Sequence, residues 1–260
     1  MVRLSEPAVL RFEAVSRFFP VGPQVIRAVD GVDLEIGPGI TMVVGPSGSG
    51  KTTLLRLAAG LQRPGSGRVW RRPESRLGMV FQEPRLLRSL TVEGNILLGL
   101  GPGREARRGL DRVREVEELL GLGRFRTAYP DQLSGGLAQR VALGRALVRD
   151  PDLLLMDEPF SALDVPLRRR LQKELLGFLG LRAMSVVFVT HDLPEAVYLG
   201  DRILVMLGGR IVRDQAVALA HPRDLRSEAV HALEDTLAQA IGADSGGGTG
   251  RDPWTEEETP

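Results

Sequence analysis

Apolar and polar residues alternate in the first part of the chain. In residues 8–36 the apolar positions recur at short spacing with turn residues between them, which predicts short antiparallel strands and hence a small β layer. The apolar run Ile40–Val44 then leads into the glycine-rich segment Gly45–Thr53, and leucines at helical spacing follow it as far as Leu61. We therefore expect a strand, a glycine-rich loop and a helix in that order.

The middle of the chain has a helical spacing instead. Apolar residues recur helically between Gln82 and Ser134, with one interruption at the glycine and proline run 99–103. This pattern predicts a mainly helical insert, or helical subdomain, over about residues 84–145.

Helical and strand patterns alternate after the insert. Units of this kind, with leucine-rich and β-branched strands, predict a parallel sheet covered by helices, so the predicted fold class is α/β. Gly208 and Gly209 predict a hairpin turn at the end of the sheet. The expected elements are a helix that ends near Val148, a strand at 153–156, a helix at 167–179, a strand at 186–189, a helix at 194–199 and a strand at 203–206.

The end of the chain differs in composition. Residues 241–260 are polar and glycine-rich, so we expect a disordered tail after a single domain over residues 1–240.

Composition excludes several classes of protein. The 34 Lys and Arg residues nearly balance the 33 Asp and Glu residues, so the chain lacks the one-signed field of a general nucleic-acid binder. The absence of cysteine excludes disulfides, thiolate zinc sites and iron–sulfur clusters. No apolar run approaches the roughly 18 to 20 residues that span a bilayer, and the first residues do not resemble a secretory signal.

The glycine-rich segment matches the phosphate loop (Walker A) at every fixed position and in its context of strand and helix. Its glycines let backbone N–H groups surround a polyphosphate, Lys51 neutralises the β and γ oxygens, and the Thr52 hydroxyl can ligate Mg²⁺. The expected ligand is a nucleoside triphosphate such as ATP. The candidate residues are Gly45, Pro46, Ser47, Gly48, Ser49, Gly50, Lys51, Thr52 and Thr53.

Two carboxylates follow the predicted strand at 153–156. Asp157 is a candidate for the Mg²⁺ shell, and Glu158, on the opposite side of an extended chain, is a candidate base for an attacking water. The alternative is an acidic turn before Pro159.

A second anion-binding helix N-terminus is predicted at Ser134, Gly135 and Gly136. Ser134 also suits an ordinary helix N-cap, and both interpretations can hold. One chain does not need two phosphate cradles for one nucleotide.

The order of a phosphate loop, Leu-Ser-Gly-Gly followed by Gln139-Arg140, Asp-Glu-Pro and a later histidine resembles the nucleotide-binding subunit of ATP-binding cassette (ABC) transporters over residues 8–215. The resemblance implies a P-loop NTPase core of the ABC type that hydrolyses ATP with Mg²⁺. It implies a homodimer or paired cassette in which two subunits sandwich two ATP molecules head to tail. Ser134 of one chain would then close on the γ-phosphate held by Lys51 of the other.

The resemblance assigns further residues. Gln82 is similar to the glutamine that touches Mg²⁺ and the attacking water, and Asp164 ends the loop that crosses the dimer. His191 is similar to the histidine that contacts the γ-phosphate. Phe19 lies where the family places an aromatic residue on adenine, although Phe18 and a role in core packing remain alternatives.

The chain departs from the family pattern at three positions. Leu137 and Ala138 replace commoner residues of the signature segment, which we define as Leu133–Arg140. We expect function to survive this change. Gly144 lies inside a predicted helix and should cost about 1 kcal/mol there, which a closely packed neighbour could explain.

The resemblance also implies partners. Segments such as YPDQLSGG look most like bacterial importers of nitrate, sulfonates, taurine and related solutes. These pair a peripheral ATPase on the cytoplasmic face of the membrane with a permease, docked here near Gln82 to Ile96, and with a solute-binding protein. Alternatives are an exporter ATPase or a soluble ABC protein of DNA repair or translation, but the insert leaves no room for a long coiled-coil arm. A lone phosphate-loop kinase or GTPase would leave the signature segment without a purpose.

Overall fold

The computed structural model describes residues 8–101, 109–161, 163–179 and 184–242. Within these ranges the first sheet is antiparallel and has the order β2-β1-β4, formed by β1 (Leu10–Val21), β2 (Gln24–Ile36) and β4 (Ser66–Arg71). The predicted small β layer is confirmed, while β4 was not predicted. Phe19 pairs with Ile26 in the register of β1 and β2, so these two side chains share one face of the sheet.

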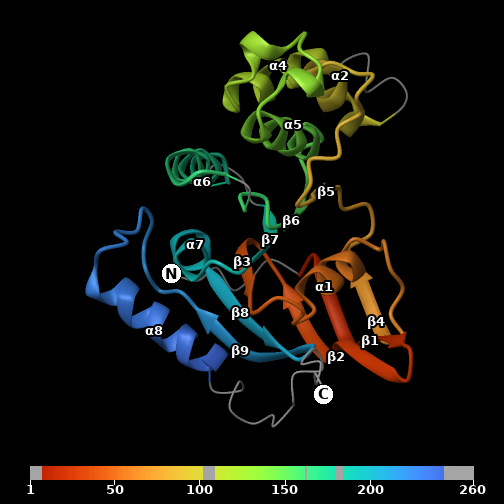
Figure 1. The fold of residues 1–260 in the computed structure, drawn as a ribbon, viewed down its shortest axis with the longest axis vertical. Coiled ribbons are helices and arrows are strands. Elements are labelled where there is room, and N and C mark those ends of the chain that lie inside the picture. Colours follow the sequence, from red (N-terminus) through yellow and green to blue (C-terminus); the bar gives the residue numbers. More distant parts are fainter. Residues whose placement is uncertain (1–7, 102–108, 162, 180–183, 243–260) are drawn as a thin grey trace, which may run out of the picture.

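A second sheet of the described residues has the order β5-β6-β7-β3-β8-β9 (Figure 1). Neighbouring strands from β5 to β8 are parallel, and β9 pairs antiparallel with β8 through the turn at Gly208 and Gly209. The predicted parallel sheet and hairpin are both confirmed. Its strands are β3 (Gly39–Val44), β5 (Leu77–Val80), β6 (Leu153–Asp157), β7 (Ser185–Thr190), β8 (Arg202–Leu207) and β9 (Arg210–Ala216).

Helices cover this sheet and bury its strands. Every residue of β6 and β7 is buried, which explains why these strands read as continuous apolar runs rather than alternating ones. One apolar core lies between the sheet, α1 and the β1–β2 layer, and the other lies on the side of α6, α7 and α8. The covering helices are α1 (Lys51–Ala58), α6 (Val165–Leu179), α7 (Leu193–Leu199) and α8 (Glu228–Gly242).

Helix α8 was not predicted from the sequence. It reaches Gly242 and therefore enters the segment expected to be a disordered tail. The rest of that tail, residues 243–260, and the first seven residues considered for a secretory signal lie outside the described residues.

The regular structure described between β5 and β6 is entirely helical and lies at one end of the molecule, beyond the β5 edge of the parallel sheet (Figure 1). This arrangement agrees with the insert predicted near residues 84–145. A side chain at Gly144 would lie 3.2 Å from Ile96 and from Leu120, so close packing accounts for the glycine, as expected. The elements are α2 (Val92–Leu97), α4 (Leu110–Leu119), α5 (Gly135–Leu147) and short 3₁₀ turns at Leu98–Leu100, Gly123–Phe125 and Pro130–Gln132.

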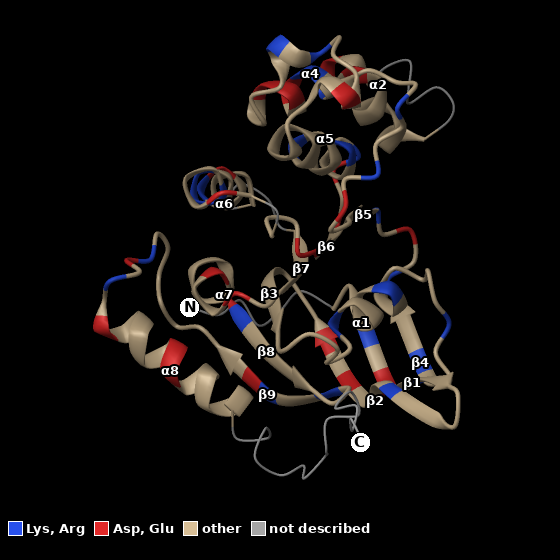
Figure 2. Cartoon of the chain, viewed as in Figure 1, with Lys and Arg blue, Asp and Glu red and all other residues tan. Residues whose placement is uncertain are grey.

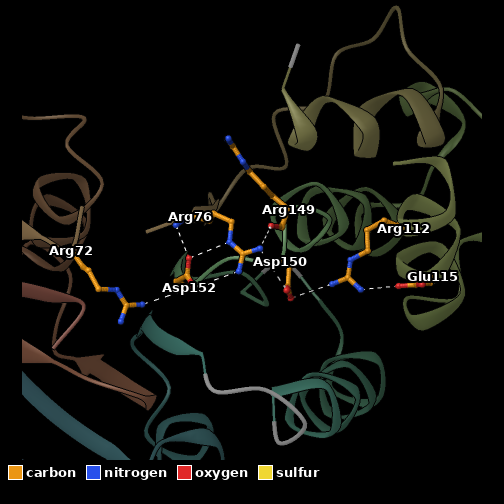
Figure 3. Close-up of polar contacts among 7 residues, drawn as sticks. All are labelled: Arg72, Arg76, Arg112, Glu115, Arg149, Asp150 and Asp152. Carbon is orange, nitrogen blue, oxygen red and sulfur yellow. Dashed lines mark hydrogen bonds and ion pairs between the residues drawn. The ribbon is translucent and has the colours of Figure 1, made fainter. Parts of the chain in front are cut away.

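A network of ion pairs ties the insert to the sheet where α5 leads into β6 (Figure 3). Arg112 of α4 donates to Asp150 over 3.3 Å, and Arg76, just before β5, lies 3.7 Å from the same carboxylate. Arg76 also donates to Asp152 over 3.2 Å and lowers the pKa of that carboxyl group. The linker at 150–152 is therefore held by charges from both the insert and the core.

Candidate nucleotide site

Four predicted site segments follow four neighbouring strands. Gln82 comes after β5, Glu158 after β6, His191 after β7 and Gly45 after β3, and these strands are adjacent in the order β5-β6-β7-β3. Because the carboxyl ends of parallel strands meet at one edge of a sheet, segments far apart in sequence converge there.

A pocket of about 500 Å³ opens at this edge. It brings together most of the predicted phosphate loop with Phe19, Gln82, Glu158 and His191. The lining residues are Phe19, Ile26, Ala28, Ser47, Gly48, Gly50, Lys51, Thr52, Thr53, Gln82, Glu158 and His191. Predicted residues outside this lining are Gly45, Pro46, Ser49, Ser134, Gly135, Gly136, Asp157 and Asp164.

The phosphate loop requires glycine at two of its positions. Gly45 has a φ of 154° and Gly50 a φ of 104°, a backbone conformation that residues with a Cβ rarely adopt. A Cβ at Gly45 would overlap the carbonyl oxygen of Met206, and a Cβ at Gly50 would overlap that of Ala28. The loop therefore packs tightly against β2 and the end of β8.

Lys51 lies inside the loop and is only 6% exposed. Its Nζ donates to the carbonyl oxygens of Gly45 and Pro46, each over 2.8 Å. Burial lowers the pKa of Lys51, while the nearby carboxylates of Glu158 and Asp157 act in the opposite direction. The ammonium group is held where a polyphosphate would complete its neutralisation.

Thr52 and Asp157 place two oxygen ligands side by side. The Thr52 hydroxyl donates to Asp157 Oδ1 over 3.0 Å, and burial raises the pKa of Asp157 against the opposing effect of this hydrogen bond. Hydroxyl and carboxylate oxygens are the donors that Mg²⁺ prefers, and Mg²⁺ usually takes one or two protein ligands together with phosphate and water oxygens. The pair fits Mg²⁺ in this mode, and the described residues contain no cluster of three His, Cys, Asp or Glu that could hold a metal ion.

Glu158 has an unusual backbone conformation directly after β6. Its φ of 43° lies in the left-handed region, and its N–H donates to Val189 of β7 over 3.0 Å. Glu158 Oε2 lies 3.1 Å from His191 Nδ1, so Nδ1 carries the proton in this contact because a carboxylate only accepts. Non-glycine residues with positive φ cluster at functional sites, and this one turns its carboxylate towards the pocket.

Comparison with known proteins agrees with this geometry. The family model described as ABC transporter matches residues 29–161. An aliphatic sulfonates import ATP-binding protein of Xanthomonas axonopodis pv. citri is 44% identical over 231 residues, which cover 83% of this chain and 90% of the relative. The chain belongs to the ABC transporter family. It is an ATPase whose hydrolysis of ATP is coupled to transport.

Other relatives of this ABC ATPase agree over most of its length. An aliphatic sulfonates import ATP-binding protein of Streptomyces avermitilis is 41% identical over 92% of this chain and 93% of its own. A dimeric ATP-binding cassette in a post-hydrolysis state with ADP and Pi has a TM-score of 0.72 and 30% identity, covering 81% of this chain and all of that one. In the part of this ABC ATPase that the structure describes, no helix combines the length and apolar character needed to cross a membrane.

The two candidate phenylalanines have different surroundings. Phe19 lines the pocket, whereas Phe18 is 42% exposed and contacts Arg27. Ile26 and Ala28 of β2 also line the pocket, and we did not predict them. Ile26 lies beside Phe19 because of the register of the hairpin, which the sequence pattern did not determine.

The signature residues of this ABC ATPase lie away from its own pocket. Ser134 is exposed and N-caps α5, where its Oγ accepts from Leu137 N over 3.4 Å. Asp164 is also exposed and caps α6 by accepting from Leu167 N over 2.9 Å. The N-cap interpretation of Ser134 is therefore confirmed, while action of both residues on a second chain stays a prediction.

Proposed function

We propose that the chain is the ATP-hydrolysing subunit of an importer for small organic anions of the aliphatic sulfonate class, working with a separate permease. The observation that carries this proposal is the pocket that unites Lys51, Gln82, Glu158 and His191 at one sheet edge, combined with a signature segment that does not reach it. The named activity of the sulfonate-import relatives supports the choice of solute.

In this proposal the phosphate loop and Lys51 bind the triphosphate, and Phe19 stacks on the adenine ring. Thr52 and Asp157 would hold Mg²⁺, with Gln82 as a further contact. A bound Mg²⁺ supplies positive charge against the phosphate oxygens. Lys51 transfers its hydrogen bonds from the carbonyl oxygens of the loop to the phosphate oxygens.

Glu158 is the proposed base for the attacking water. Its carboxylate accepts the proton while the water oxygen bonds to the γ-phosphorus and the bond to the β–γ bridging oxygen breaks, giving ADP and phosphate. His191, 3.1 Å from Glu158, orients that carboxylate and contacts the γ-phosphate, and Gln82 orients the water. Each of these residues lines the pocket.

The second half of each site would come from another copy of the chain. Ser134, Gly135 and Gly136 form the N-terminus of α5, whose N–H groups and dipole favour an anion. We propose that they close on the γ-phosphate of the opposite chain and that Asp164 contacts the opposing site. The solved dimeric cassette with ADP and Pi supports the pairing of two chains.

The permease would dock on the segment from Gln82 to Ile96, which links the sheet to the insert. Leu87 in this segment is half exposed, and Arg145 of α5 holds the carbonyl oxygens of Pro84 and Arg85 over 2.8 Å each. We further propose a position on the cytoplasmic face of the membrane and an external solute-binding protein. Nucleic acid is not a proposed partner, because both signs of charge occur throughout core and insert (Figure 2).

Trapping the assembly tests the proposal. Tagged Glu158→Gln is held with ATP in cells that produce the chain, membranes are solubilised gently, and co-purifying proteins are identified by mass spectrometry. The control is the same variant with Lys51→Ala. We expect a permease and a solute-binding protein to co-purify with Glu158→Gln but not with the variant that also carries Lys51→Ala. Recovery of ribosomal or DNA-bound partners alone would overturn the transporter assignment.

The solute class needs its own experiment. Cells lacking the gene for this chain should lose growth on an aliphatic sulfonate as the only sulfur source and keep growth on sulfate. Unchanged uptake of labelled sulfonate in these cells would exclude this class.

A further inference from the structure

The first turn of α6 touches the signature segment. A side-chain carbon added at Gly136 would lie 2.5 Å from Leu167 Cδ2 and 3.4 Å from Leu163 Cδ2. Gly136 is buried beneath these leucines, and Figure 1 places α6 between α5 and α7. A shift of the N-terminus of α5 therefore acts directly on the first turn of α6.

The same turn of α6 reaches the residue next to His191. Arg168 Nη1 donates to Asp192 Oδ2 over 3.0 Å, and Arg168 Nη2 donates to the Leu163 carbonyl over 3.1 Å. The Arg168 side chain is 24% exposed, so this ion pair is partly shielded from water. Asp192 uses its other oxygen to accept from Glu195 N and cap α7.

Helix α6 also holds the residue on the other side of His191. Gln172 donates to the buried carboxyl group of Glu195 over 2.9 Å, and that carboxyl group is also hydrogen-bonded to the Thr190 side chain. The Thr190 hydroxyl in turn accepts from Asp192 N over 3.1 Å. The His191 side chain itself is 60% exposed, so its position depends on the backbone that these contacts hold.

We propose that Arg168 is a positioning residue for His191 and relays the position of the signature segment to it through α6. The inference rests on the proposed function, in which the signature segment serves the opposite ATP and His191 the ATP of its own chain. When the signature segment closes on the ATP of the opposite chain, α6 would transmit this movement and place His191 at the ATP of its own chain. Two hydrogen bonds from one planar guanidinium make this connection stiffer than a single contact.

Turnover provides the first test. Arg168→Met should lower kcat by about fivefold or more, because positioned catalytic groups contribute factors of this size or larger, and should change the Kd for ATP less than about twofold. Arg168→Lys keeps the charge next to Asp192 and should recover part of the rate. Asp192→Asn retains the cap on α7 and should resemble Arg168→Met. The control is Arg170→Met on the same helix, an exposed partner of Glu174, which should behave as wild type.

Imidazole NMR tests the relay without any turnover. The chain has three histidines, and His221 serves as an internal reference. Arg168→Met should move the His191 ring signals, and Gly136→Ala, which pushes on Leu167, should move them only while Arg168 is present. Unchanged His191 signals in Arg168→Met would overturn the inference. If His191→Ala leaves turnover intact, the proposed role of His191 fails instead, so the two failures are distinguishable.

Discussion

The Thr52 hydroxyl donates to Oδ1 of Asp157 over 3.0 Å and so joins the first turn of α1 to the end of β6. The fold itself therefore holds the two oxygens side by side. Preorganised ligands need no reorganisation when a cation arrives, which favours binding.

Replacement of Thr52 by valine tests the magnesium ligand. Thr52→Val keeps the shape of the side chain but removes the hydroxyl, and the Mg²⁺ concentration for half-maximal ATP hydrolysis should rise about tenfold or more, as expected for loss of a metal ligand. The matched control is Thr53→Val, since Thr53 also lines the pocket. If the Mg²⁺ concentration for half-maximal hydrolysis were the same in Thr52→Val and Thr53→Val, Thr52 would be excluded as a metal ligand.

Asp157 should destabilise the nucleotide-free fold at neutral pH. Burial raises its pKa in the folded chain, so the folded state holds the proton more tightly than the unfolded state. As pH rises through the raised pKa, stability is lost. Asp157→Asn should therefore melt a few degrees higher than wild type at pH 7, and the difference should shrink towards pH about 4, where free carboxyl groups take up protons. Calorimetric melting at both pH values measures this, and a lower Tm at pH 7 would contradict the prediction.

Glu158→Gln should bind ATP but hydrolyse it at least about tenfold more slowly, because positioned base catalysis contributes a factor of about 10² or more. The amide keeps the size of the side chain. Phosphate release and ATP affinity are measured together, with the exposed Glu118→Gln on α4 as a control. Near-normal turnover would exclude Glu158 as the base.

Lys51→Ala should weaken ATP binding itself by about tenfold or more, because the buried ammonium is the main positive charge of the loop and charge-assisted hydrogen bonds are strong. Isothermal titration calorimetry measures the Kd. Lys173→Ala, on the exposed side of α6, should have no effect. An ATP affinity equal to that of wild type would contradict the proposed clamp.

Phe19→Ala should raise the Kd for ATP by about three- to tenfold through loss of stacking, which contributes about 0.5–1.5 kcal/mol. Phe18→Ala is the control on the opposite face of the same strand. A large loss of Tm in nucleotide-free Phe19→Ala, with unchanged ATP affinity, would indicate a core residue instead.

The apolar runs along the chain were enough to predict strands β3, β6, β7 and β8 and the site residues that follow three of them. Asp157, Glu158 and His191 follow apolar runs whose burial makes them strands, and parallel pairing brings their ends together. Ile26 could not be predicted in the same way, because its place in the pocket depends on the register of the hairpin. Helix α8 was missed because no helical pattern was identified in residues 228–240, and the residues from 241 onward were judged by composition alone. Val230 and Leu237 are the residues of α8 that are buried. The contact between Arg168 and Asp192 depends on the packing of two helices.

The pocket draws its walls from both sheets. Phe19 and Ile26 belong to the antiparallel sheet, whereas Glu158 and His191 follow strands of the parallel one. In the proposed binding mode a nucleotide forms a cross-link between the two layers, and amide hydrogen exchange at the free end of the β1–β2 hairpin should slow when it binds. ADP retains the base and keeps that cross-link after the phosphate departs. In this binding mode the hairpin would respond to the presence of any adenine nucleotide, and the wall formed by Glu158 and His191 would respond to its γ-phosphate.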